Sequence, residues 1–145
     1  SRKNPRRAAT GRKALMPTYS DELLRLAEVV PTPIPEGAAV VERANRLCGD
    51  RVVVSPEIQG NVVVALRWHS EGCSILKAGA AYLARGIRGK DTTTAHAWIT
   101  EFKDSFNSEA AHLPGAMAAV YGLPARYKCA LLPFEACEDF LRQRL

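Results

Sequence analysis

The sequence predicts an α+β fold in which a small three-stranded, mostly antiparallel sheet is covered on one face by four to five helices. Runs rich in β-branched residues gather between residues 38 and 69, and such runs favour strands. Apolar residues at helical spacing precede and follow this region, which indicates helices on both sides of it in the chain. Because so small a sheet cannot bury its apolar side chains alone, we expect the helices to pack against it.

The first helix is expected to begin at Ser20, which is placed to cap it, and the acidic residues Asp21 and Glu22 suit the positive end of the helix dipole. Prolines at positions 31, 33 and 35 then interrupt the helical pattern, so residues 31–37 should form an extended connector. The apolar face of this helix would consist of Leu23, Leu24, Leu26, Ala27 and Val30.

Three strands are expected over residues 38–43, 51–55 and 61–69. Residues 59–61, with the sequence Gln-Gly-Asn, have the composition of a tight turn, which predicts a hairpin between the second and third strands. Residues 48–50, with the sequence Cys-Gly-Asp, should form another turn between the first and second strands.

The remaining helices follow the strands. One is expected from Cys73 to a stop at Gly86 and Gly89, and the next follows a cap at residues 91–94. Residues 107–123 fit no single element, although a short helix over 116–121 is compatible with them. Pro124 should start the final helix. The three apolar stripes consist of Ile75, Ala78, Gly79, Tyr82, Leu83 and Ile87; Ala95, Trp98, Ile99, Phe102 and Phe106; and Tyr127, Ala130, Leu131, Phe134, Cys137 and Leu141.

The positive charge of the chain is concentrated at its N-terminus. The net charge is +5, but residues 1–20 hold six cations and no acid, so the rest of the chain carries −1. We therefore expect residues 1–18 to form a disordered basic arm and residues 19–145 to form a single domain. No aromatic residue lies between these cations to stack on bases, so nucleic acid is not the expected partner. An organelle transit peptide is a less favoured interpretation of the arm.

Hydropathy gives no indication of a membrane protein. No apolar run approaches the roughly 18 residues that a membrane span needs, and the N-terminus lacks the apolar core of a secretory signal. The sequence thus predicts a cytoplasmic protein whose thiols stay reduced.

The main candidates for metal ligands or nucleophiles are cysteines. Cys48 lies in a turn with Asp50, and Cys73 is expected in the first turn of a helix, where unpaired backbone N–H groups and the helix dipole favour its thiolate. Cys129 lies near the start of the last helix, so packing could bring these termini together. Because the chain has no Cys-x-x-Cys pair, the spacing alone is weak evidence for zinc.

Cys137 is excluded from such a site by helix geometry. It lies eight residues after Cys129, which displaces it by about 12 Å along a continuous helix. Two sulfur atoms that each lie roughly 2.3 Å from one zinc ion cannot be so far apart. Cys137 also falls on the apolar stripe, so we interpret it as a buried structural thiol.

Two cations flank the third cysteine. Three thiolates and one carboxylate overcompensate a divalent ion, and Arg126 and Lys128 are placed to offset the excess negative charge. The alternative is that both are ordinary solvated cations, although positive charge early in a helix opposes the helix dipole.

Three segments resemble, in order, the cysteine motifs of the IscU/NifU-like iron–sulfur assembly scaffolds. They are NRLCGD at residues 45–50, EGCSI at 71–75 and PARYKCALL at 124–132. The resemblance covers roughly residues 19–145. IscU-type scaffolds have a histidine immediately before the third cysteine, whereas this chain has Lys128, as in the SufU-type branch.

The resemblance implies a zinc site made by Cys48, Asp50, Cys73 and Cys129. It also implies that Cys48 accepts persulfide sulfur from a pyridoxal-phosphate-dependent, SufS-like cysteine desulfurase and passes it toward downstream iron–sulfur assembly proteins. In that branch a histidine of the desulfurase displaces the acceptor cysteine from zinc. Zinc would keep the acceptor thiol ionised until then.

The chain departs from the family pattern at positions around the ligands. Arg46 replaces a proline of the first motif, and Leu76 and Gly79 replace serines that follow the second. The ligand residues are therefore retained, whereas residues of the docking surface differ.

Three functional hypotheses follow from the sequence. The favoured one is a zinc-dependent sulfur acceptor, which would act as a sulfurtransferase. The second is a scaffold that assembles a labile iron–sulfur cluster on the same four residues, with iron in place of zinc. The third is a non-enzymatic structural zinc domain, or a binding module that uses the basic arm. No histidine matches a ligand position of the family, and His69 is expected to be a surface or packing residue.

Overall fold

The structure is a computed structural model that describes residues 21–106 and 115–144. The expected basic arm, the helix cap at Ser20 and residues 107–114 of the ambiguous segment 107–123 lie outside the described residues. Within them, no helix combines the length and the apolar character that a membrane span requires.

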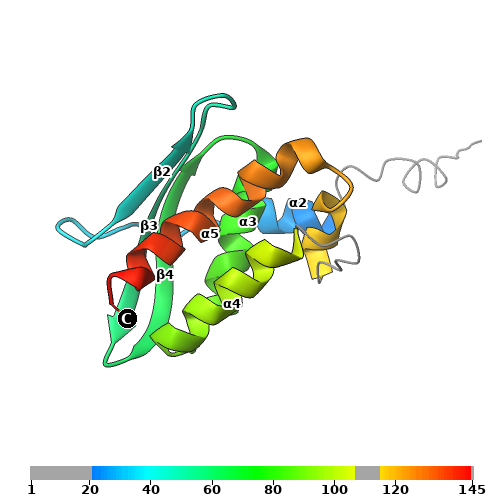
Figure 1. Ribbon diagram of the computed structural model, residues 1–145. Coiled ribbons are helices and arrows are strands. Elements are labelled where there is room, and N and C mark those ends of the chain that lie inside the picture. Colours follow the sequence, from blue (N-terminus) through cyan, green and yellow to red (C-terminus); the bar gives the residue numbers. More distant parts are fainter. Residues whose placement is uncertain (1–20, 107–114, 145) are drawn as a thin grey trace, which may run out of the picture.

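A three-stranded sheet forms one layer of the molecule and the helices form the other (Figure 1). The elements, in chain order, are α2 (Asp21–Ala27), β2 (Val41–Asn45), β3 (Asp50–Gln59), β4 (Val62–Glu71), α3 (Ser74–Ile87), α4 (Thr92–Ser105), the 3-10 helices η1 (Gly115–Val120) and η2 (Pro124–Arg126), and α5 (Tyr127–Arg142).

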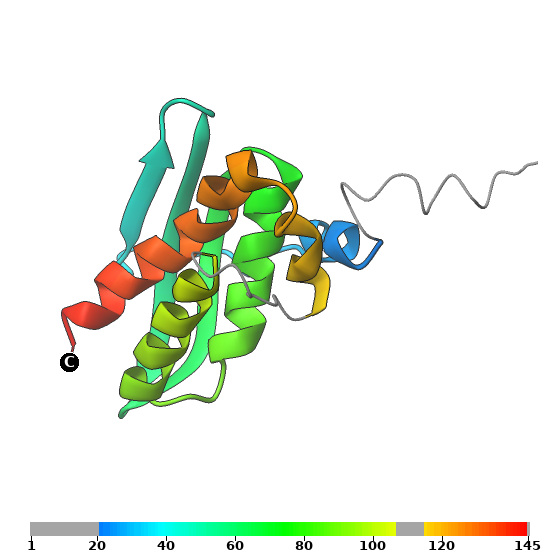
Figure 2. The same cartoon turned by 45° about the vertical axis from the view of Figure 1, so that its right-hand side comes forward.

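The sheet has the order β2-β3-β4, and both pairs of neighbouring strands are antiparallel. Helices α3 and α5 pack on one face of the sheet, and α4 lies against α5 on the outer side (Figure 2). The predicted fold class, an α+β fold with a small antiparallel sheet covered on one face by helices, is therefore confirmed.

Side chains alternate along the strands between the helix-covered face and the opposite face. Val52 and Val54 of β3 are fully buried beneath the helices. On β4 the buried positions change from Val63 to Leu66 and Trp68, a switch from odd to even numbers. A β-bulge accounts for the switch, because the pairing shifts between Glu57 and Ile58 and adds one residue to β4.

Strand β3 is longer than the sequence predicted. We expected it to end at residue 55, before a proline, but it continues through Pro56 to Gln59. Strand β2 pairs no further along β3 than Val54, so Pro56 has a strand partner on one side only, in β4. A proline is tolerated there because an edge position requires no second ladder of hydrogen bonds.

The first helix is shorter than predicted. Helix α2 ends at Ala27, and Val30, expected on its apolar face, is 86% exposed. Val30 precedes Pro31, and the residue before a proline is disfavoured in helical conformation. The buried side of α2 is therefore limited to Leu23 and Leu26.

An aromatic cluster joins the three long helices. The rings of Phe102 on α4 and Phe134 on α5 stack with centroids 4.2 Å apart, and Trp98 contacts both. Tyr82 of α3 contacts Trp98 and Phe102. Phe134 is fully buried at the centre of the cluster, so its ring fixes α5 relative to α4.

We predict that Phe134→Ala lowers the free energy of unfolding by about 3–5 kcal/mol, because it removes a buried ring and leaves a cavity between α4 and α5. Urea unfolding followed by far-UV circular dichroism measures the loss. Leu47→Ala is the control, since the Leu47 side chain is 91% exposed and its removal should change stability by less than about 0.5 kcal/mol. Equal losses for both variants would contradict this description of the core.

Candidate metal centre

Three chain segments meet at one end of the molecule. They are the turn between β2 and β3, the start of α3 and the start of α5 (Figure 1). Cys48, Cys73 and Cys129 come from these three segments in turn. Two helix N-termini therefore point toward the same region, and their dipoles favour negative charge there.

Cys48 lies at an exposed position in the turn between β2 and β3. Asn45, the last residue of β2, organises this turn: its carbonyl oxygen accepts the Cys48 N–H at 3.2 Å, and its Oδ1 accepts the Leu47 N–H at 3.2 Å. The Asn45 side-chain amide also donates to the Cys48 Sγ at 3.5 Å. Gly49 has a φ of +73°, a conformation that glycine adopts without strain, and it returns the chain into β3.

Asp50 is the first residue of β3 and its side chain is buried, with 2% exposure. Strand alternation places it on the same face as Val52 and Val54, toward the helices. Its Oδ1 accepts the backbone N–H of Cys73 at 3.3 Å. Its Oδ2 is buried, and no residue in the described part of the chain donates a hydrogen bond to it.

Cys129 is the third residue of α5 and is fully buried. Gly79 of α3 makes this position possible, because a Cβ atom on it would lie 2.6 Å from the carbonyl oxygen of Ala130. A larger residue would push the start of α5 away from α3. Pro133 has no N–H to donate to the Cys129 carbonyl, although α5 continues through it.

Burial raises the pKa of the Cys129 thiol well above its ordinary value, and hydrogen bonding and charge from Asp50 and Cys73 raise it further. These three side chains are thus neighbours, and each is an acid whose anion repels the others. A divalent cation bound between them would reverse this effect by favouring the thiolate.

Ligand atoms of Cys48, Asp50 and Cys129 all lie within 4.8 Å of one another. The structure thereby brings together three of the four residues that the sequence singled out as ligands. Cys73 is not in this compact group, but it borders Cys129 and its N–H holds Asp50. It is half-buried at the N-cap of α3, one residue before the helix begins.

These residues fit a zinc ion by their chemistry. Thiolate sulfur and carboxylate oxygen are ligands that zinc takes in tetrahedral sites, and three cysteines with one aspartate would supply four. A buried carboxylate oxygen without a hydrogen-bond donor costs free energy unless a cation or donor compensates it. Asp50 Oδ2 is such an atom. The other oxygen of Asp50 accepts the Cys73 N–H, and the carboxylate lies beside the sulfurs of Cys48 and Cys129.

The two predicted supporting cations lie on the surface near Cys129. Arg126 is the last residue of η2 and Lys128 is the second residue of α5, and both are exposed. Lys128 also lines a groove of about 260 Å³ between β2 and α5. The groove, which we call the β2–α5 groove, is lined by Arg43, Ala44, Asn45, Arg46, Lys128, Leu132 and Glu135.

The remaining thiol and the nearby histidine stay outside the site. Cys137 is fully buried in the core, as predicted, and burial raises the pKa of its thiol to about 12. His69 is exposed on β4 and its Nε2 pairs with Glu71 at 2.9 Å, which confirms a surface role.

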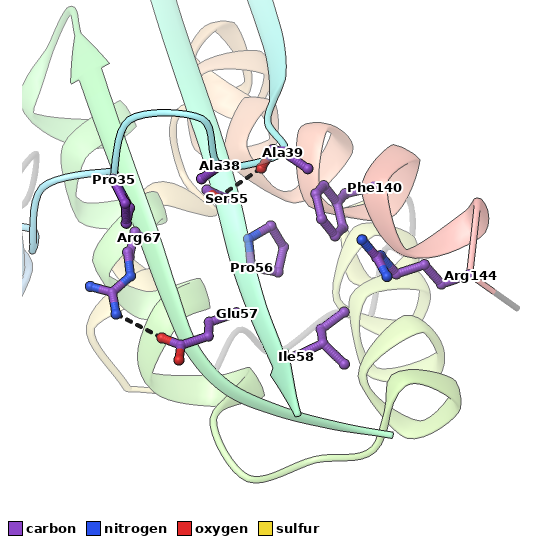
Figure 3. Close-up of a pocket in the computed structure, with 10 residues that line it drawn as sticks. All are labelled: Pro35, Ala38, Ala39, Ser55, Pro56, Glu57, Ile58, Arg67, Phe140 and Arg144. Carbon is purple, nitrogen blue, oxygen red and sulfur yellow. Dashed lines mark hydrogen bonds and ion pairs between the residues drawn. The ribbon is translucent and has the colours of Figure 1, made fainter. Parts of the chain in front are cut away.

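A second cavity, of about 350 Å³, lies at the other end of β3 (Figure 3). Glu57 and Arg67 form an ion pair on one side of it at 2.7 Å, while Phe140 of α5 and Arg144, which follows α5, reach toward it from the other side. Its lining contains no cysteine and no histidine. The cavity therefore has no set of metal-binding or nucleophilic groups comparable to the one at Cys48.

Comparison with known proteins gives a match to one family model. The family model described as the NifU-like N-terminal domain matches residues 31–118. The chain belongs to this family. Its matched segment includes the turn with Cys48 and the start of α3 with Cys73. The family is one of iron–sulfur cluster assembly scaffold proteins, and the predicted resemblance is therefore confirmed.

A curated relative and a solved structure also match this chain and support its place in the NifU-like family. The zinc-dependent sulfurtransferase SufU of Bacillus subtilis (strain 168) is 35% identical over 106 residues, which cover 68% of this chain and 71% of that protein. A structure from Fervidobacterium islandicum AW-1, described as a putative iron–sulfur cluster assembly scaffold protein for the SUF system, is 25% identical. It aligns with a TM-score of 0.75 over 86% of this chain and 96% of its own.

The N-terminal part of a nitrogen-fixing NifU-like protein from Brucella abortus shares the fold. Its structure aligns with a TM-score of 0.73 at 23% identity and covers 89% of this chain and 95% of its own. The helix-covered sheet is thus shared between this chain and members of the NifU-like family whose sequences have diverged.

We predict that thiol alkylation separates the cysteines by accessibility and ionisation. In metal-free protein at pH 8, iodoacetamide should modify the exposed Cys48 first. Cys137 should stay unmodified, because a pKa of about 12 leaves roughly one thiol in ten thousand ionised. Peptide mass mapping over time measures both. The control is denatured protein, in which Cys137 should react as well, and fast native modification of Cys137 would contradict the structure.

Proposed function

We propose that this protein is a zinc-dependent sulfur acceptor of iron–sulfur cluster biogenesis, with Cys48, Asp50, Cys73 and Cys129 as its zinc ligands. One observation carries the proposal. The three ligand atoms within 4.8 Å include two buried groups, from Asp50 and Cys129, and one exposed thiol, from Cys48. Such a site holds an ion from inside the fold while one of its thiols can be reached by a partner.

The likeness to the Bacillus subtilis sulfurtransferase supports zinc as the metal, because that protein is zinc-dependent. Zinc bound by these residues would keep the Cys48 sulfur as a thiolate at neutral pH. The helix dipoles of α3 and α5 contribute in the same direction, because the positive end of a helix favours a nearby anion.

The reaction assigned to Cys48 is a sulfur transfer. Its thiolate attacks the outer sulfur of a persulfide on the cysteine of a pyridoxal-phosphate-dependent, SufS-like desulfurase. A new sulfur–sulfur bond forms on Cys48, the bond within the donor persulfide breaks, and the donor cysteine leaves as a thiolate. The exchange consumes no external oxidant or reductant. The product is a persulfide on an exposed turn, from which downstream iron–sulfur assembly proteins could take the sulfur.

The surroundings of Cys48 suit an anionic product. Lys128 and Arg46 line the β2–α5 groove, which also contains Asn45, the hydrogen-bond donor to the Cys48 sulfur. We assign Arg126 and Lys128, which flank Cys129, the role of electrostatic support, because their positive charge would offset the thiolates and stabilise a transferred sulfur anion.

A second candidate function is a scaffold that assembles a labile iron–sulfur cluster on the same four residues. The observation that favours it is the likeness to the Fervidobacterium structure, which is described as a putative scaffold protein. Thiolates bind iron–sulfur clusters as readily as they bind zinc, so the ligand set is compatible with both. In that case the cluster would be the cargo of the site.

We predict that protein purified without added metal contains one zinc per chain and stimulates a cysteine desulfurase. Incubation with the desulfurase and cysteine should add the mass of one sulfur atom to Cys48. In Cys48→Ala, both the stimulation and the added mass should disappear, because the acceptor sulfur is gone. Metal analysis, sulfide release and mass spectrometry of the intact chain measure the three effects.

Cys137→Ala is the matched control, since Cys137 is buried away from the site and its removal should leave sulfur transfer intact. Iron and acid-labile sulfide in place of zinc, together with cluster transfer to an acceptor protein, would support the scaffold function instead. A sulfur that Cys48→Ala still accepts would contradict the role of Cys48.

A further inference from the structure

Gly72, between the end of β4 and Cys73, lies in contact with the carboxylate of Asp50. A Cβ atom built on Gly72 would lie 2.2 Å from Asp50 Oδ1 and 2.8 Å from Leu76 Cδ2. The Leu76 atom is the end of a flexible side chain and can move. Asp50 is buried and held by the Cys73 N–H, so its carboxylate cannot move without losing that hydrogen bond.

The two oxygens of Asp50 have different surroundings. Oδ1 faces Gly72 and accepts the Cys73 N–H, while Oδ2 is buried without a donor among the described residues. A carboxylate oxygen of Asp50 also lies within 4.8 Å of the sulfurs of Cys48 and Cys129. Because Oδ1 already accepts the Cys73 N–H and Oδ2 accepts no hydrogen bond from the described residues, Oδ2 is the oxygen better placed to bind an ion.

We propose that Gly72 is a positioning residue for the metal site, and this inference rests on the proposed function. The missing side chain of Gly72 provides the space that Asp50 Oδ1 occupies, and this contact keeps Oδ2 available to zinc. Any larger residue at position 72 rotates or displaces the carboxylate. Gly72 thus affects the metal site by positioning Asp50 and does not contact the ion itself.

A second property of Gly72 has to be separated from this one. Its φ of +152° is a conformation that other residues rarely adopt, so any substitution adds backbone strain. Strain acts whether or not Asp50 is present, whereas the steric effect requires the Asp50 carboxylate. A double-mutant cycle between positions 72 and 50 distinguishes the two effects.

The experiment measures zinc affinity by competition with a chromophoric chelator. Gly72→Ala should weaken zinc binding by about 10-fold or more, the size of effect seen when groups outside the ligand shell are removed. In an Asp50→Ala background the same substitution should change affinity by less than about twofold. An equal loss in both backgrounds would overturn the inference, because Gly72 would then act by strain alone.

Gly89→Ala is the matched control. Gly89 also has a positive φ, of +86°, but nothing lies within 4 Å of the position of its Cβ. This variant should lose stability through strain and keep the zinc affinity of the unmodified protein. A similar loss of affinity in Gly89→Ala would show that general backbone strain is sufficient and would also overturn the inference.

The same cycle is measured without metal, by the urea midpoint of unfolding. Gly72→Ala should lower the midpoint more in the natural background than in Asp50→Ala, and if it prevents folding, Asp50→Ala should restore folding to the double variant. Equal shifts, or a double variant that stays unfolded while Asp50→Ala folds, contradict the inference. Failure of the unmodified protein to bind zinc would refute the proposed function, while this metal-free cycle would still decide the role of Gly72.

Discussion

The buried carboxylate of Asp50 is the constraint on which the rest of the site depends. An anion removed from water is costly unless hydrogen bonds or a cation compensate it, and one Asp50 oxygen has the Cys73 N–H as its donor. That single hydrogen bond ties the start of β3 to the start of α3. The other oxygen is buried without a donor among the described residues, and a carboxylate oxygen of Asp50 lies within 4.8 Å of the sulfurs of Cys48 and Cys129.

The helices make this arrangement possible by setting the distance between the layers. Gly79 lets the start of α5 approach α3, and the ion pair of Arg43 with Asp139 joins β2 to α5 at 2.8 Å. Cys129 is thereby buried against Asp50, while Cys48 stays on the outer turn. Two buried ligand residues, Asp50 and Cys129, with one exposed thiol, that of Cys48, suit a site that retains an ion while the exposed thiol reacts.

Much of this could be predicted from the sequence, because the signals are local. Turn residues placed Cys48 and Asp50 together, and helix-start signals placed Cys73 and Cys129 at element ends. The path of β3 through Pro56, the bulge in β4 and the contact between Gly72 and Asp50 could not be predicted. Each depends on which residue lies opposite in space, and a glycine does not reveal by its identity whether it serves a turn or a close approach.

The ligands bound directly to the metal test most directly the claim that Cys48, Asp50, Cys73 and Cys129 bind one zinc ion. X-ray absorption at the zinc edge of protein purified without added metal should show three sulfur ligands at about 2.3 Å and one oxygen at about 2.0–2.2 Å. In Asp50→Ala the oxygen contribution from the carboxylate should be lost or replaced by that of another ligand. A zinc shell of four sulfurs, or iron with iron–iron scattering and no zinc, would contradict the account.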